Sequence, residues 1–215
     1  MMRIQRKFAL LTAIMLFLTM ACFSGMQPPK PGDTLILDDF SDLKGNWDTW
    51  EERDNTTVTY YHGGLIMVIN APNRDVLTTH IGSYPDVAIE ATAQKLTGPD
   101  DNAFGLVCRY QDMNNYYALI ISSDGYYGIV KVIQGAYHLI SGNNLNYDER
   151  IRQGNAENLI QAECQGNEIA LAVNGEELAR VQDSDLETGR TGLITGTYEE
   201  AGAAILFDHF VVKIP

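Results

Sequence analysis

Apolar and polar residues alternate along much of the chain from Thr34 onward, the pattern of strands with one buried face. The segment 87–95 (VAIEATAQK) alternates in this way throughout. The apolar segments 104–110 and 116–122 flank a short polar loop. No window of eleven or more residues carries a helical stripe, because Gly154 interrupts the nearest candidate. The pattern therefore predicts an all-β protein.

Turn signals separate these segments at regular intervals. Asn174-Gly175, between 168–173 and 176–182, is the strongest hairpin signal in the chain. Asp124-Gly125 and Gly135 mark further tight turns. About a dozen short strands joined in this way predict two antiparallel layers, a β-sandwich. Each layer would keep one face in the core and one face in water.

The N-terminus has the order of a secretory signal peptide. Arg3, Arg6 and Lys7 precede an uncharged apolar run over residues 8–21. That run is shorter than the roughly 20 apolar residues that a membrane-spanning helix needs. We therefore predict a signal peptide over residues 1–21.

Cys22 directly follows the apolar run. The stretch 18–22 (LTMAC) resembles the lipobox of bacterial lipoproteins, although Thr19 stands where that motif usually has leucine. The resemblance implies a lipid on the Cys22 sulfur, cleavage before it, and a chain anchored to the membrane from outside the cytoplasm. Simple secretion, with Cys22 free or paired, remains the alternative.

Residues 22–33 follow as a tether rich in Pro and Gly, with no periodicity. The remaining residues, 34–215, contain no further linker, which predicts one large β domain.

The chain is strongly acidic. Its formal net charge is −13, and a chain cleaved before Cys22 would carry 12 basic and 28 acidic residues, or −16. Phosphate binding needs a basic surface, so we predict no nucleic-acid partner. An acidic surface suits neutral sugars or divalent cations.

Lipidation of Cys22 would leave two cysteines, Cys108 and Cys164. Two cysteines in a protein outside the cytoplasm are enough to form one disulfide bond. Both cysteines lie in strand-like segments, so pairing depends on whether the two strands are neighbours. Two buried reduced cysteines remain the alternative.

Four stretches resemble a known group of folds: 38–50 (DDFSD…GNWDTW), 98–132 (GPDDNAFGLVCRY…), 158–183 (NLIQAECQGNEIALAVNGEELARVQD) and 207–214 (FDHFVVKI). Together they look like the concanavalin A-like lectin/glucanase superfamily. Within it, the nearest resemblance is to the 3-keto-disaccharide hydrolase domain and to laminin-G-like domains of bacterial lipoproteins. The resemblance implies a jelly roll of two curved antiparallel sheets, paired terminal strands and a concave sheet that commonly holds glycans.

The resemblance implies that a glucanase of this superfamily would carry its two catalytic carboxylates in the pattern E-x-D-x-x-E on one strand. Neither Glu90 nor Glu163 is followed by a second carboxylate at alternating spacing. This absence argues against that chemistry and leaves open a site assembled from separate strands. No nucleophile elbow accompanies the four histidines, and no Cys or His pair has metal-ligand spacing. We therefore predict no catalytic residues.

Calcium is the more plausible ion, since related jelly rolls often carry a structural calcium near the paired terminal strands. The resemblance points to Asp39 and Asp208, whose hard oxygens suit Ca²⁺. The alternative is that both aspartates only cap strand ends.

Sugar binding calls for aromatic rings that contact C–H faces and for fixed hydrogen-bonding groups. Such residues cluster around one double hairpin, and the predicted ligand-binding set is Arg109, Asn115, Tyr117, Tyr127 and Lys131. Arg109 is a forked donor in an apolar strand and needs a partner. That partner would be a ligand hydroxyl or, equally, Glu90 or Glu163 across the sheet.

The sequence and its resemblance leave three candidate functions. The first is a membrane-tethered, non-catalytic carbohydrate-binding lipoprotein whose partner is a glycan. The second, implied by resemblance alone, is a glycoside hydrolase or lyase of the 3-keto-disaccharide type. The third is a structural or protein-binding domain of the laminin-G type.

Overall fold

The computed structural model describes residues 29–43 and 45–215. Within them the chain forms sixteen strands and no helix, as the alternating pattern predicts. Two of the sixteen have only two residues each, which explains why sequence patterning indicated about a dozen.

One antiparallel sheet, called here the terminal sheet, has nine strands and contains both ends of the domain. Its hydrogen-bonded order is β14-β13-β12-β6-β16-β4-β3-β2, with β1 pairing β16. Its strands are β1 (Thr34–Asp38), β2 (Trp50–Glu51), β3 (Thr57–Tyr61), β4 (Gly64–Ile69), β6 (Val87–Thr97), β12 (Asn158–Gln165), β13 (Glu168–Val173), β14 (Glu176–Gln182) and β16 (Ala203–Lys213).

The second antiparallel sheet has seven strands and is called here the hairpin sheet, because β7 to β10 follow one another in it. Its order is β10-β9-β8-β7-β15-β5, with β11 pairing β9. Its strands are β5 (Arg74–Thr79), β7 (Asn102–Asp112), β8 (Asn115–Ile121), β9 (Tyr126–Ile133), β10 (Ala136–Leu139), β11 (Asn146–Tyr147) and β15 (Arg190–Thr197).

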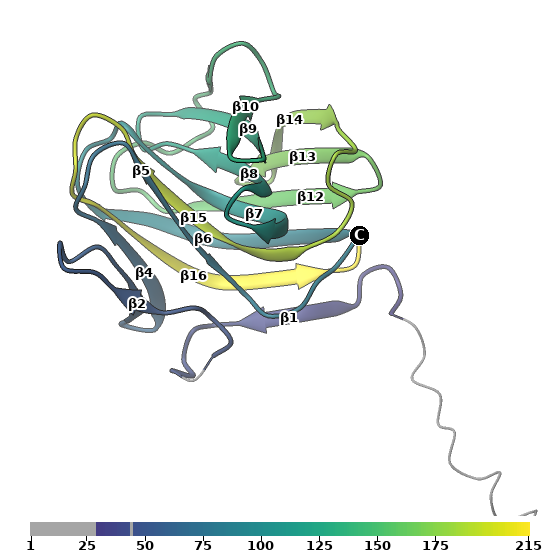
Figure 1. The fold of residues 1–215 in the computed structure, drawn as a ribbon, viewed down its shortest axis with the longest axis horizontal. Helices are drawn as coiled ribbons and strands as arrows, with labels where there is room; N and C mark the ends of the chain where they lie inside the picture. The colour runs from purple at the N-terminus through teal and green to yellow at the C-terminus, as the bar shows by residue number, and fades with distance from the viewer. Residues whose placement is uncertain (1–28, 44) are drawn as a thin grey trace, which may run out of the picture. The chain divides into compact units, whose positions relative to one another are not determined.

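The core lies between the two sheets, and Figure 1 shows them as layered arrays of strands. In β6 the buried residues Val87, Ile89 and Ala91 alternate with more exposed neighbours. This period of two sends one set of side chains into the core and the other to the outer face of the terminal sheet. The prediction of an antiparallel jelly-roll sandwich is therefore confirmed.

The predicted turns lie where the signals indicated. Asn174 (φ 54°) and Gly175 (φ 88°) both adopt the left-handed conformation between β13 and β14. That conformation at two successive residues is what a tight two-residue hairpin demands. Asp124-Gly125 and Gly135 likewise join β8 to β9 and β9 to β10.

The first and last strands pair, as the resemblance implied. Leu37 lies opposite Val211, and Figure 1 shows β1 alongside β16. Behind β1, the indole Nε1 of Trp47 donates to Asp38 Oδ2 at 2.8 Å. The Trp47 ring packs edge-on against Phe210, so this buried tryptophan belongs to the core.

A disulfide bond joins Cys108 on β7 to Cys164 on β12 and so links the two sheets. Both cysteines are fully buried. Two strands that are distant in sequence thus face each other across the core, which the sequence could not establish.

The described residues contain no helix long and apolar enough to cross a membrane. The predictions for the signal peptide over 1–21 and for lipid on Cys22 lie outside the described residues. Those predictions therefore stay predictions, as does the tether over 22–33.

Candidate functional site

A groove crosses the outer face of the terminal sheet, over the five neighbouring strands β16, β6, β12, β13 and β14. Adjacent strands lie about 4.8 Å apart, so five strands span roughly 19 Å. The groove encloses about 300 Å³. The side chains that line it alternate along each strand with the side chains that point into the core.

Small apolar side chains form the floor of the groove. Ala88, Ala170 and Ala172 lie there, and Val211 closes one end. Alanine methyls are short, so at these positions they leave room above the backbone between the longer side chains of Glu90, Glu163 and Arg180. The hollow therefore arises from the sequence of outward positions along β6 and β13.

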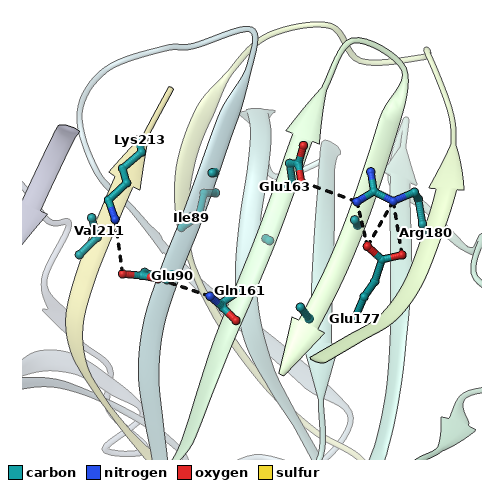
Figure 2. Close-up of a pocket in the computed structure, with 12 residues that line it drawn as sticks. Ile89, Glu90, Gln161, Glu163, Glu177, Arg180, Val211 and Lys213 are labelled. Atoms are coloured by element: carbon teal, nitrogen blue, oxygen red, sulfur yellow. Dashed lines mark hydrogen bonds and ion pairs between the residues drawn. The ribbon is translucent and has the colours of Figure 1, made fainter. Parts of the chain in front are cut away.

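One wall carries Glu90, which contacts two neighbours. Its carboxylate lies 4.0 Å from the ammonium nitrogen of Lys213 and accepts a hydrogen bond of 3.5 Å from Gln161 Nε2. Figure 2 shows all three side chains rising from adjacent strands on the same side of the sheet. The wall thus presents an acid, an amide and a cation in one row.

Arg180 is the centre of the opposite wall. Its guanidinium lies 2.8 Å from Glu177, 2.9 Å from Glu168 and 3.7 Å from Glu163. The hydrogen bond with Glu177 raises the pKa of Arg180, so the guanidinium stays charged. All four side chains are more than a third exposed, which leaves their remaining donors and acceptors open to a ligand.

Hydrogen bonds and ion pairs hold each wall: Glu90 contacts Lys213 and Gln161, and Glu163 contacts Arg180 (Figure 2). The groove therefore offers polar groups of both signs on either side of an apolar floor. Such an arrangement suits a ligand with many hydroxyl groups and C–H faces.

The predicted ligand residue Arg109 lies elsewhere, in the core, with only 1% of its surface exposed. Its guanidinium donates to the carbonyl oxygens of Gly166 (2.7 Å), Leu186 (2.9 Å) and Pro85 (3.1 Å). A fourth contact reaches Asp86 at 3.5 Å. Because loop carbonyls occupy its donors, Arg109 is a structural residue, and its assignment to a ligand is wrong.

Two of the predicted tyrosines point into the sandwich. Tyr117 is fully buried and donates to Asp183 at 2.5 Å. Tyr127 is partly buried against the core and donates to the carbonyl of Leu178 at 3.0 Å. A strand alternates its faces, so one ring of each Tyr-Tyr pair had to face inward. The ring of Tyr117 is therefore not accessible to a sugar, whereas Tyr127 is partly exposed and its ligand role stays a prediction.

Lys131 and Asn115 are also bound within the protein. Lys131 lies 2.5 Å from Asp183 and 2.6 Å from Asp185, with 15% of its side chain exposed. Asn115 donates to Asp112 and accepts from the backbone of Gln134, which holds the loops at that end. The structure thus gives both residues partners within the protein, and their ligand role stays a prediction.

Asp39 and Asp208 both lie near the paired strands β1 and β16. Asp39 accepts from the Ser41 hydroxyl and backbone N–H, which lowers its pKa, and Asp208 accepts from the N–H of His209. Among the described residues, no group of three or more His, Cys, Asp or Glu side chains is arranged to hold a metal. Calcium takes six to eight oxygens. Two carboxylates do not complete such a sphere, and calcium stays a prediction.

The sequence pattern marked Glu90 and Glu163 as possible catalytic acids or as partners of Arg109, but it gave no role to Arg180; in the structure Glu90 contacts Lys213 and Glu163 contacts Arg180. One signal was available: the outward positions of 168–173 are Glu168, Ala170 and Ala172, a charge followed by two methyls. What the sequence could not show is that β6 and β14 lie on either side of β12 and β13.

No protein-family model and no curated protein matches this sequence. Solved structures do. The carbohydrate-binding module CBM66 from Bacillus subtilis superposes with a TM-score of 0.63 at 18% identity, covering 79% of this chain and 96% of that one. The GH43 protein BlXynB from Bacillus licheniformis gives 0.64 at 14% identity, covering 88% of this chain but 41% of that one.

The Bacillus licheniformis β-glucanase also superposes, with a TM-score of 0.59 at 11% identity, covering 86% of this chain and all of that one. Likenesses at such low identity show the fold alone. The chain therefore has the concanavalin A-like jelly-roll fold, which carbohydrate-binding modules and glycosidases share. The narrower resemblance to 3-keto-disaccharide hydrolases is not confirmed by these structures.

Proposed function

We propose that this chain is a membrane-tethered lipoprotein, outside the cytoplasm, whose β-sandwich binds a glycan along the groove of the terminal sheet without cleaving it. The observation that carries the proposal is the groove itself, with methyl groups on its floor and charged walls. Sugar C–H faces would pack on Ala88, Ala170 and Ala172. Sugar hydroxyls would donate to Glu90 and Glu163 and accept from Arg180.

The ligand we expect is an extended, uncharged oligosaccharide. Its length follows from a groove that crosses five strands and is open to solvent. Its neutrality follows from walls that hold both signs of charge within 4.0 Å of each other. The fold likeness to a carbohydrate-binding module supports a glycan but does not identify one.

The non-catalytic part of the proposal depends on the positions of the acids. Glycoside hydrolysis needs two carboxyl groups flanking one scissile bond. Here Glu90 and Glu163 lie diagonally across β6 and β12, but Lys213 and Gln161 contact Glu90 and Arg180 contacts Glu163, so each carboxylate already has partners within the protein. Arg109, the arginine that the sequence offered as a ligand-binding group, is buried and does not line the groove that holds both acids.

A glycan array probed with the full chain, held in solution by a polyoxyethylene detergent, tests the proposal. We expect binding to a subset of neutral glycans, and at least tenfold weaker binding for Arg180→Ala, about 1.4 kcal/mol. Ala88→Leu, which fills the floor, should weaken binding comparably. Arg74→Ala is the matched control, because Arg74 also pairs with acids but lies on β5.

Silence across the array would overturn the proposal and favour the protein-binding alternative. Release of a cleaved glycan, lost in Glu90→Gln, would overturn its non-catalytic part. Labelling with radioactive palmitate tests the anchor: we expect label on the natural chain and none on Cys22→Ala. Equal labelling of the two would contradict lipidation.

A further inference from the structure

A second hollow lies on the outer face of the hairpin sheet, which faces away from the core between the sheets. Tyr116, Tyr137 and Tyr198 contribute rings to it, and Asp75 contributes a carboxylate. The volume is about 130 Å³, and the rest of the lining is alanine, isoleucine and valine. This cavity shares no residue with the groove, so it is a separate feature of the molecule.

The polar groups of the cavity lie around one hydrogen bond. The hydroxyls of Tyr116 and Tyr137 lie 3.2 Å apart, and the carboxylate of Asp75 lines the same cavity. Asp75 lies directly opposite Gly196, where a β-carbon would clash with its carboxylate. Glycine at 196 therefore lets the acid lie against the sheet beneath the rings.

Asp75 makes no ion pair with any Lys, Arg or His in the described part of the chain, and burial raises its pKa. Further negative charge lies nearby. Burial, together with Asp75, Asp101 and Asp124, raises the pKa of Tyr198 to about 12. The cavity thus combines uncharged aromatic rings, apolar walls and negative charge without a cation.

We propose that this cavity binds a small organic ammonium group carrying methyl substituents, such as a trimethylammonium headgroup. The aromatic faces attract the cation through their quadrupoles, and Asp75 supplies the opposite charge. The methyl substituents suit walls made by Ala118, Ile120 and Val130.

Other ligand classes fit less well. Calcium takes six to eight oxygen ligands, whereas the cavity has one carboxylate and three phenols. A neutral sugar would leave the charge of Asp75 without a counter-ion. Anions would be repelled by Asp75, Asp101 and Asp124.

Calorimetric titration of the full chain, in the same detergent, with choline, tetramethylammonium and 3,3-dimethylbutan-1-ol tests this inference. The alcohol has nearly the shape of choline but no charge, so it isolates the contribution of the cation. We expect both cations to bind and the alcohol to bind at least tenfold more weakly. Equal binding of choline and the alcohol, or no binding of either cation, would overturn the inference.

Two variants locate the binding. Asp75→Asn removes the charge at nearly constant shape and should weaken choline binding at least tenfold. Tyr137→Ala removes a ring that is 58% exposed, so the variant should fold and lose binding. The matched controls are Glu187→Gln and Tyr61→Ala, an exposed acid and an exposed ring outside the cavity. Undiminished choline binding by Asp75→Asn or Tyr137→Ala would contradict the assignment.

Discussion

Arg109 is enclosed by the sandwich, whereas Arg180 stands on its outer face, and the two arginines have opposite partners. Three backbone carbonyls surround Arg109 in the core. Three glutamates surround Arg180 within reach of solvent. The carbonyls occupy the donors of the buried guanidinium, so Arg109 holds together the loops that carry Pro85, Gly166 and Leu186. The glutamates around Arg180 are exposed, so both they and the guanidinium remain accessible to solvent. Arg180 can therefore contact a ligand.

The largest effect should come from Arg109→Ala. Removing the guanidinium leaves the carbonyls of Pro85, Leu186 and Gly166 without donors and opens a cavity. We expect the free energy of unfolding to fall by about 3–5 kcal/mol, as for other broken buried charged networks. Chemical denaturation of the full chain measures it. A fall below about 1 kcal/mol would contradict the structural role.

The disulfide beside Arg109 should rank second. Cys108 precedes Arg109, and Cys164 is joined to Cys108 across the core. Replacing both cysteines by alanine should lower the free energy of unfolding by about 2–4 kcal/mol. Thermal unfolding under oxidising and reducing conditions checks this, with the double variant as control. An oxidised protein that melts at the same temperature as the variant would argue against the bond.

Asp183 extends the comparison to pH. Burial alone would raise its pKa, but hydrogen bonds from Lys131 and Tyr117 outweigh burial and the net pKa is lowered. A carboxyl group whose pKa is lower in the folded than in the unfolded protein adds stability above the unfolded pKa of about 3.9. That added stability is lost as the pH falls through the folded pKa. We expect about 1–2 kcal/mol to disappear below about pH 4.

Denaturation curves at a series of acidic pH values test this prediction. Asp183→Asn should be less stable near neutral pH and should lose less stability on acidification. The same pH dependence in both proteins would mean that other groups cause it.

Arg180→Ala should change stability little, in contrast with Arg109→Ala. Its ion pairs are exposed, and such pairs each contribute about 0–1 kcal/mol. We expect the variant to unfold within about 1 kcal/mol of the natural protein while its glycan binding falls at least tenfold. Denaturation and binding are measured on the same preparation. A strongly destabilised variant would show that Arg180, too, is structural.

Calcium should have the smallest effect. Asp39 and Asp208 already accept local backbone N–H groups, so any site there would be weak, with a Kd of about 1 mM. About 1 mM calcium would then stabilise by about 0.4 kcal/mol, a rise in Tm of roughly 1 °C. Differential scanning with and without chelator measures it, with Asp208→Asn as control. An equal rise in Tm with calcium in Asp208→Asn would show that the ion binds at a site that does not include Asp208.

Much of the fold could be predicted because its signals are local. Alternation along 87–95 gave a strand, and Asn174-Gly175 gave a hairpin, since both depend only on neighbouring residues. The candidate site could not be predicted in this way. Arg109 was a sound inference from residue type, but its burial depends on loops at Pro85, Gly166 and Leu186, which no local pattern locates.

By itself, then, the sequence determined the strands, their turns, the acidic composition and the class of fold. The tertiary structure alone decided which strands became neighbours, and with them the groove, the tyrosine cavity and the pairing of Cys108 with Cys164. The physical reason is range: alternation and turn geometry act over two to four residues. A ligand surface needs side chains such as Glu90 and Arg180, ninety positions apart in the sequence, to face solvent on the two walls of one groove.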